Sequence, residues 1–318
     1  MDYSVTVSQL IEKMNLKNYT PEIDTDKVLI MDPGMNRPAV QFGGFFEHFD
    51  AGRIQICGNV EHAYIKAMHT EEENIEIMNE FFSYKPPCLI FCRGLEPYEF
   101  IIEAGRKHGV PVLTSDAVTS AFVHEVDRWL HVELAPRISV HAVLVDVYGE
   151  GVLIMGESGI GKSEAALELI KRGHRLVADD VVEIKKVSEA TLLGSAPNIT
   201  RHFIELRGIG IIDVKSLFGV ECVKLEQSID LVINLEEWSK DTEYDRLGLE
   251  DQYTEFLGNR VVSHNIPIRP GRNIAIIVES AAVNHRQKKM GYNAASDLLD
   301  HLGLEAEAKE VIKDYDAF

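Results

Sequence analysis

The chain has 318 residues, about twice the length of a typical domain, and this length predicts two domains. Hydrophobic residues make up 45% of the chain, which is typical of a soluble globular protein. The 51 acidic and 32 basic residues give a formal net charge of −19, which argues against nucleic acid or an anionic membrane as the main partner. No apolar run reaches the roughly 18 residues that a membrane-spanning helix needs.

Residues 1–134 are predicted to form an N-terminal α/β sheet domain. Apolar runs that favour strands occur at 28–31, 53–57, 88–92 and 110–113. Helical patterns begin the domain near Val7 and recur at 60–69, 71–83, 97–108 and 118–130. Strands separated by helices indicate a mostly parallel sheet. The aromatic stretch 42–49 predicts core or a subunit contact, and this half carries no catalytic motif.

The cysteines and the N-terminus indicate a cytoplasmic protein. The four cysteines are Cys57, Cys88, Cys92 and Cys222. They are few and lie in apolar surroundings, so we expect buried free thiols in a reducing compartment. The N-terminus lacks the basic segment and apolar core of a secretory signal.

Residues 135–318 are predicted to form the second domain, after the breaker Ala135-Pro136. An apolar run at 138–147 predicts one strand, and the glycine-containing segment 148–151 predicts a turn into the next strand. We therefore expect a hairpin immediately before the stretch described next.

The stretch GESGIGKS matches G-x-x-x-x-G-K-S, the pattern of a phosphate-binding loop. Its glycines let backbone N–H groups face inward around phosphate oxygens. The lysine can place a charge at the outer phosphates, the serine hydroxyl can hold Mg²⁺, and the N-terminus of the helix predicted at 163–172 adds partial positive charge. The predicted nucleotide site comprises Gly156, Glu157, Ser158, Gly159, Ile160, Gly161, Lys162 and Ser163.

Two carboxylates, Asp179 and Asp180, lie between apolar strand segments, 17 and 18 positions after Lys162. They are either solvated acids at a strand end or a base or metal site facing the phosphates. Because neighbouring side chains on a strand alternate in direction, we expect only one of them to face the loop easily.

Three further segments stand out in the second half. In 202–213, glycines interrupt a strand pattern, which suggests backbone close to a ligand. The charged segment 236–255 is expected to be exposed, and 266–272 holds two prolines and a glycine, so it should not be a central strand. A strand at 229–234 and helices around 274–285, 293–303 and 305–315 complete the prediction.

Taken in order, His141, the phosphate loop, the Asp179-Asp180 pair, ELRGIGIID at 205–213 and PIRPGR at 267–272 resemble the HPr kinase/phosphorylase family. The resemblance implies a Mg²⁺-dependent enzyme that phosphorylates a serine of the phosphocarrier protein HPr with ATP, or with pyrophosphate. It also implies removal of that phosphate by inorganic phosphate, giving pyrophosphate. It further implies a P-loop kinase domain similar to phosphoenolpyruvate carboxykinase and a homo-oligomer, a hexamer. It also implies that fructose 1,6-bisphosphate is an effector and that the protein has a role in carbon catabolite repression.

The resemblance also implies roles for individual residues. The catalytic residues would be His141, Lys162, Asp180 and Arg246. The metal ligands would be Ser163 and Glu205, with Asp179 and Arg207 in support. The segment used for phosphorolysis would be Pro267, Ile268, Arg269, Pro270, Gly271 and Arg272.

Asp180 is the residue on which this chemistry depends. A serine hydroxyl is a poor nucleophile at neutral pH, so a carboxylate must accept its proton. In reverse, a protonated Asp180 would donate to the leaving serine oxygen, and we expect partial burial beside Asp179 to favour that form.

Two alternatives remain open from the residues. One is a small-molecule kinase or carboxykinase-like enzyme on the same domain. The other is a non-catalytic, nucleotide-regulated binding module, against which the intact Lys162, Ser163 and Asp180 argue.

Overall fold

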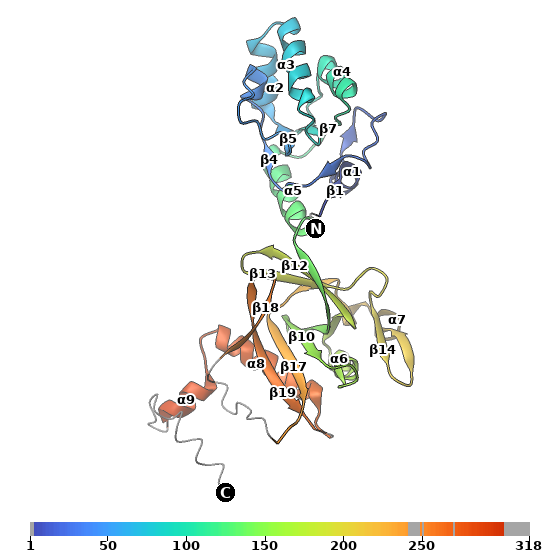
Figure 1. The fold of residues 1–318 in the computed structure, drawn as a ribbon, viewed down its shortest axis with the longest axis vertical. Helices are drawn as coiled ribbons and strands as arrows, with labels where there is room; N and C mark the ends of the chain where they lie inside the picture. Colours follow the sequence, from blue (N-terminus) through green and yellow to red (C-terminus); the bar gives the residue numbers. More distant parts are fainter. Residues whose placement is uncertain (1–2, 241–248, 250, 270, 302–318) are drawn as a thin grey trace. The chain divides into compact units, whose positions relative to one another are not determined.

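The computed structural model describes residues 3–240, 249, 251–269 and 271–301. The chain divides into two compact units between Pro136 and Arg137, two residues after the expected end of the first domain. In Figure 1 the first unit runs from blue to green and the second from green to red.

The first unit is a three-layer α/β structure. Its five-stranded sheet has the order β2 (Lys17–Asn18), β7 (Val112–Thr114), β6 (Leu89–Phe91), β5 (Ile54–Cys57), β4 (Met35–Asn36). Strands β4 to β7 run parallel and β2 is antiparallel, so the mostly parallel sheet is confirmed. A short antiparallel pair joins β1 (Val5–Thr6) to β3 (Leu29–Ile30).

Helices cover both faces of this sheet. They are α1 (Val7–Met14), α2 (Asn59–Met68), α3 (Glu71–Ser83), α4 (Glu99–His108) and α5 (Thr119–Glu133). One core joins the sheet to α1 and α5, and a second joins it to α2, α3 and α4. Successive side chains of a strand point to opposite faces, so Ile56 enters the first core and Cys57 the second.

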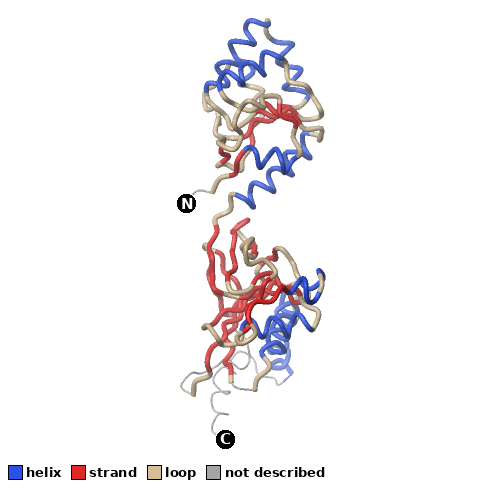
Figure 2. The backbone as a smooth tube through the Cα atoms, turned by 90° about the vertical axis from the view of Figure 1, so that its right-hand side faces the viewer, coloured by secondary structure: helices blue, strands red, loops and turns tan. Residues whose placement is uncertain are grey.

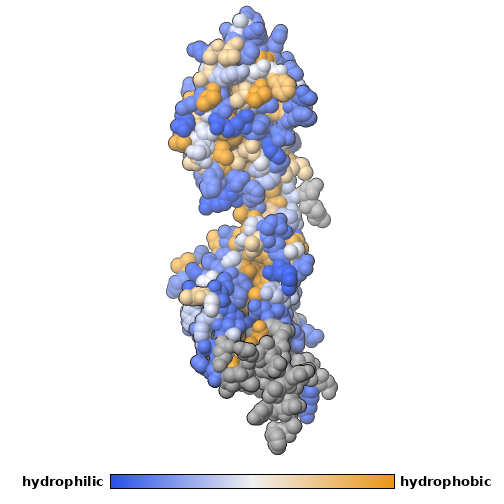
Figure 3. All heavy atoms as spheres, turned by 90° about the vertical axis from the view of Figure 1, so that its left-hand side faces the viewer, coloured by the Kyte–Doolittle hydropathy of each residue, from blue (hydrophilic) through white to orange (hydrophobic). Residues whose placement is uncertain are grey.

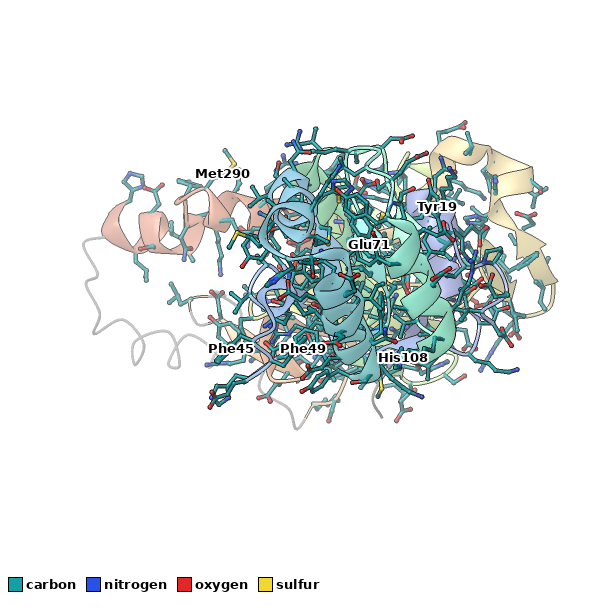
Figure 4. The ribbon with its side chains drawn as sticks, turned by 90° about the horizontal axis from the view of Figure 1, so that it is seen from above. Tyr19, Phe45, Phe49, Glu71, His108 and Met290 are labelled. Carbon is teal, nitrogen blue, oxygen red and sulfur yellow. The ribbon has the colours of Figure 1, made fainter. Side chains whose placement is uncertain are left out.

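The aromatic stretch 42–49 contributes to the second core, so the first of its two predicted roles, core or subunit contact, is confirmed. Phe42 is fully buried, and Phe49 packs on Phe81 of α3 with ring centroids 5.3 Å apart. Phe45 is 54% exposed and lies at the rim of the unit in Figure 4, whereas Phe49 lies against its helices.

Polar residues cover most of the face shown in Figure 3, with apolar ones scattered among them.

The second unit is built on a six-stranded mixed sheet. The order is β11 (Arg175–Ala178), β9 (Val143–Val147), β10 (Glu150–Gly156), β17 (Leu231–Glu237), β19 (Asn259–Ile268), β18 (Gln252–Phe256). The predicted hairpin of β9 and β10 is confirmed, with Val147 opposite Glu150. On its other side β10 pairs parallel with β17.

Two layers pack against this sheet. Helices α6 (Lys162–Lys171) and α8 (Ile274–Lys289) bury one face, and the helices of this unit lie on one side of its strands in Figure 2. A four-stranded antiparallel sheet covers the other face, in the order β16 (Glu226–Ser228), β13 (Thr191–Ser195), β12 (Val181–Ser188), β8 (Arg137–His141). A hairpin of β14 (Phe203–Leu206) and β15 (Gly210–Asp213), with α7 (Val214–Phe218) and α9 (Ala294–His301), completes the described part.

One prediction about strands is wrong. The apolar run 138–147 is two strands, β8 and β9, in different sheets, because the chain changes sheet at buried Ala142. The segment that begins at 266 is not a central strand, as predicted, since β19 continues to Ile268 but pairs there only with β17. Pro267 is tolerated because β18 pairs with β19 only up to Ser263, so the side of Pro267 away from β17 has no strand partner.

Cys57, Cys88 and Cys92 are buried and free, as predicted, while Cys222 is free and only partly buried. Among the described residues, no helix is both long enough and apolar enough to span a membrane. The helix predicted at 305–315 and most of the charged segment after Lys240 lie outside the described residues.

Candidate phosphoryl-transfer site

The phosphate loop joins β10 to α6, as the sequence predicts (Figure 1). Gly159 and Gly161 have φ angles of 87° and 104°, in the region that favours glycine. A Cβ atom on Gly159 would also meet the guanidinium of Arg207, but that is the movable end of an exposed side chain, so the positive φ is what favours glycine there. Gly161 has no side chain to cap α6, which leaves the N–H groups of the first turn available to an anion.

Lys162 is held against the loop backbone. It is only 7% exposed, and its Nζ donates to the carbonyl oxygens of Gly156 at 2.7 Å and Glu157 at 3.0 Å. Burial lowers the pKa of Lys162 below its usual value, although Asp179 and Asp180 act in the opposite direction. The loop therefore carries a largely desolvated cation at its centre.

Asp179 connects three segments of the site. It is 4% exposed and accepts hydrogen bonds from Ser163 Oγ at 2.9 Å and from the backbone N–H of Glu205 at 3.0 Å. Burial raises the pKa of Asp179, while these two hydrogen bonds act to lower it. Because the proton of the Ser163 hydroxyl is donated to Asp179, the lone pairs of Oγ remain free for a cation.

Asp180 and His141 form an exposed pair. The ring Nδ1 of His141 lies 2.9 Å from Oδ1 of Asp180, and the two side chains are 51% and 60% exposed. The pair forms because β8 lies beside β12, with His141 opposite Val181. The partial burial expected for Asp180 is therefore wrong, and the buried carboxylate is Asp179.

Both aspartates line the same pocket, so the expectation that only one could easily face the loop is also wrong. The reason is local, since β11 ends at Ala178 and Asp180 adopts a left-handed conformation with φ of 67°. Strand alternation does not apply across that turn.

The 202–213 stretch is a hairpin rather than an interrupted strand. Glu205 and Arg207 line the pocket, and the guanidinium of Arg207 donates to Ser158 Oγ at 3.2 Å. Gly208 and Gly210 have φ angles of 80° and 103° and form the turn. They do not line the pocket, so the prediction of their backbone beside a ligand is not supported there.

These groups enclose a pocket of about 120 Å³. It is lined by His141, Val143, Ser158, Gly159, Gly161, Lys162, Ser163, Glu164, Asp179, Asp180, Glu205 and Arg207. The sequence analysis did not predict Val143 or Glu164 at this site. Glu164 could have been predicted, because it directly follows Ser163 in the first turn of the helix.

The oxygen donors of this pocket fit Mg²⁺. The hydroxyl of Ser163 and the carboxylate of Glu205 are hard ligands, and Asp179 holds both residues in place. Among the described residues, no three histidine, cysteine or acidic side chains are gathered into a metal cage.

Two of the remaining predicted site residues, Arg246 and Pro270, lie outside the described residues. The described residues of the 267–272 segment do not line this pocket. Pro267 and Ile268 end β19, and the guanidinium of Arg269 lies 3.4 Å from the ring centroid of Trp238. Arg272 donates to the carbonyl of Pro267 at 2.7 Å.

Comparison with known proteins gives the same family for both units. A family model for the HPr Serine kinase N terminus matches residues 5–130, and one for the HPr Serine kinase C-terminal domain matches residues 132–302. The HPr kinase/phosphorylase of Lachnoclostridium phytofermentans is 67% identical over 300 residues, which cover 94% of this chain and 97% of that protein. That of Caldicellulosiruptor bescii is 54% identical, covering 94% and 96%.

Among solved structures, the Hpr(Ser) kinase/phosphatase from Coxiella burnetii is 39% identical, covering 51% of this chain and 98% of that chain, with a TM-score of 0.46. The family models and the full-length relatives show that this chain belongs to the HPr kinase/phosphorylase family, a family of enzymes.

Proposed function

We propose that this chain phosphorylates a serine of HPr with ATP, or with pyrophosphate, and removes the same phosphate with inorganic phosphate, giving pyrophosphate. The observation that carries the proposal is the His141–Asp180 pair, which lies exposed in the wall of the phosphate-loop pocket. A carboxylate in that position is open to a hydroxyl brought by another protein.

In the forward direction, Asp180 accepts the proton of the serine hydroxyl as the serine oxygen bonds to the transferred phosphorus. The bond from that phosphorus to ADP, or to phosphate when pyrophosphate is the donor, breaks at the same time. His141 orients the carboxylate through the 2.9 Å contact. Lys162, Arg207 and the N-terminus of α6 neutralise phosphate charge, and we assign the same role to Arg246. Bound Mg²⁺ would supply further neutralisation, held by Ser163 and Glu205.

In the reverse direction, an oxygen of inorganic phosphate bonds to the phosphorus while the bond to the serine oxygen breaks. Protonated Asp180 donates to that oxygen, and the proton gained by serine is balanced by the one lost from phosphate. We assign the 267–272 segment to this direction, since Arg269 and Arg272 place positive charge in it.

Family membership supports related proposals. They are a hexamer, a second unit similar to phosphoenolpyruvate carboxykinase, fructose 1,6-bisphosphate as an effector, a role in carbon catabolite repression, and a cytoplasmic location. The buried free thiols of Cys57, Cys88 and Cys92 fit a reducing compartment.

The experiment that tests the function is transfer to purified HPr in both directions. With ATP and Mg²⁺, HPr should gain one phosphate on one serine, and added phosphate should then release one pyrophosphate per phosphate removed. An HPr with that serine replaced by alanine is the control. ATP turnover without labelled HPr would indicate a small-molecule kinase, and ATP binding without any turnover would indicate a binding module.

Removal of divalent cations is expected to abolish both reactions, and Mg²⁺ should restore them. Glu205→Gln should require about 10- to 100-fold more Mg²⁺ for half-maximal rate, because it removes the charge of a proposed ligand. Glu255→Gln, which changes an exposed glutamate on β18, is the control. Equal Mg²⁺ requirements in the two variants would remove Glu205 from the metal site.

The hairpin beside the pocket favours a protein substrate. Ile209 and Ile211 are 74% and 73% exposed, next to the pocket residue Arg207. The double change Ile209→Ser/Ile211→Ser is expected to raise the KM for HPr about 5- to 30-fold, as loss of one or two kcal/mol of contact energy would do. ATP affinity should stay unchanged, since neither side chain lines the pocket.

Phe45→Ser is the control for the hairpin variant, because Phe45 is a comparably exposed apolar side chain in the other unit. Measurement of KM for HPr and of Kd for ATP in all three proteins separates the effects. A KM for HPr that matches the control would place the protein contact elsewhere.

A further inference from the structure

A second cavity lies within the first unit, and the proposed function does not use it. Its volume is about 420 Å³, which is within the usual range of small-molecule sites. It is lined by Arg37, Asn59, Val60, Arg93, Thr119, Ser120 and Val123.

The cavity lies at the carboxyl ends of the parallel strands. Arg37 follows β4, Arg93 follows β6, and Asn59 begins α2 directly after β5 and Gly58. Thr119 begins α5, the helix after β7. Open α/β sheets bind ligands in this crevice, where loops and helix N-termini from different strands meet.

The charged residues that line the cavity are both arginines. Arg37 is held by Glu61, whose side chain is 4% exposed, through a 2.8 Å contact. Arg93 has a φ of 66°, and its backbone N–H donates to the carbonyl of Ala117 at 2.9 Å, which fixes the start of its side chain. Arg93 is exposed, and among the described residues it makes no ion pair.

Hydrogen-bond donors lie on the same wall. The N-cap of α5 is Val118, which has no side-chain acceptor, so the first N–H groups of the helix remain open to an anion. Thr119 is 8% exposed, and its Oγ1 has no partner of good geometry among the described residues, although the Cys92 thiol beside it is a weak one. A buried hydroxyl with no stronger partner than a thiol is uncommon, and this one points to a ligand.

Gly58 brings these groups together. A Cβ atom on it would lie 2.9 Å from Thr119 Oγ1 and 3.3 Å from Nη2 of Arg37. Glycine at this position therefore lets the arginine and the threonine converge. The side chains of Val60 and Val123 add an apolar wall to the same cavity.

We propose that this cavity binds a phosphorylated small molecule. The phosphate lies between Arg93, Arg37 and the N-terminus of α5, because guanidinium groups and open helix N–H groups are the usual phosphate ligands in proteins. The organic part lies against Val60 and Val123. Every residue that lines this cavity belongs to the first unit, whereas the phosphate loop belongs to the second.

Hydrogen–deuterium exchange of the full chain tests this proposal, because it reports on both units in one sample. The probes are fructose 1,6-bisphosphate for sugar phosphates, AMP for nucleotides, and inorganic phosphate. One of the two organic phosphates should slow exchange in peptides covering 58–61 and 118–122. Arg93→Gln should weaken that protection at least about tenfold in probe concentration, as loss of a charged hydrogen bond does.

Arg128→Gln is the matched control, since Arg128 is an exposed arginine farther along α5 that does not line the cavity. Protection that survives Arg93→Gln, or that inorganic phosphate reproduces at equal concentration, would overturn the proposal. So would protection confined to 156–163 with both organic probes. Peptides 156–163 with ATP report separately on the phosphate loop, so failure of one site is distinguished from failure of the other.

Discussion

Asp180→Asn is expected to lower both HPr phosphorylation and phosphorolysis by about 10²- to 10⁴-fold, the usual contribution of general acid–base catalysis. The amide can neither accept the serine proton nor return it. Asparagine tolerates the left-handed conformation of this position, where φ is 67°, so the backbone should be unchanged. The measurement is kcat in each direction, with the Kd for ATP determined on the same samples.

The chain offers a matched control in Asp127, which lies 3.4 Å from His131 on α5 and is also about half exposed. Asp127→Asn should leave both rates unchanged. If Asp180→Asn retains wild-type transfer while binding ATP normally, Asp180 has no part in proton transfer.

Lys162→Met is expected to reduce transfer by at least about 10²-fold, because the variant loses the charge at the outer phosphates. The same change should not lower the midpoint of thermal unfolding. The Lys162 side chain is an ammonium held in a desolvated position, and its two acceptors, the carbonyls of Gly156 and Glu157, belong to a partly exposed loop that water can reach. Loss of activity without loss of stability would separate a functional lysine from a structural one.

The lowered pKa of Lys162 also predicts how the stability of the protein changes with pH. The pKa of Lys162 is lowered in the folded state, so the unfolded chain binds more protons than the folded one between the folded value and 10.5. The free energy of unfolding of the wild type should therefore rise relative to that of Lys162→Met as the pH increases through this window. Urea unfolding of both proteins at neutral and alkaline pH measures the difference between their free energies of unfolding. If the variant becomes more stable relative to the wild type as the pH rises, the pKa of Lys162 is not lowered by folding.

Local patterns were sufficient for most of the fold. Alternating strands and helices predicted the first unit, and the turn at 148–151 predicted the β9–β10 hairpin. The break at Ala142 was not predictable, because a buried alanine between apolar residues carries no turn signal. It is determined by the pairing of β8 with β12, which is a contact distant in sequence.

The candidate site, like the fold, could be predicted only where it depends on residues close together in the sequence. The phosphate loop was readable from eight consecutive residues, because its chemistry is local. The roles of Asp179 and Asp180 were not separable, because their burial depends on the β14–β15 hairpin and on His141, which reach the loop from distant parts of the chain. The family resemblance, rather than the pattern, pointed to Asp180 as the catalytic residue.

The most direct test of the central claim is a structure of the chain with a non-hydrolysable ATP analogue and HPr bound. We predict that the analogue's phosphates lie in the 156–163 loop, and that a carboxylate oxygen of Asp180 lies about 2.6–3.2 Å from the hydroxyl of the HPr serine. A serine hydroxyl that approaches the terminal phosphate with another side chain as its proton acceptor, or that binds away from the loop, would contradict the account.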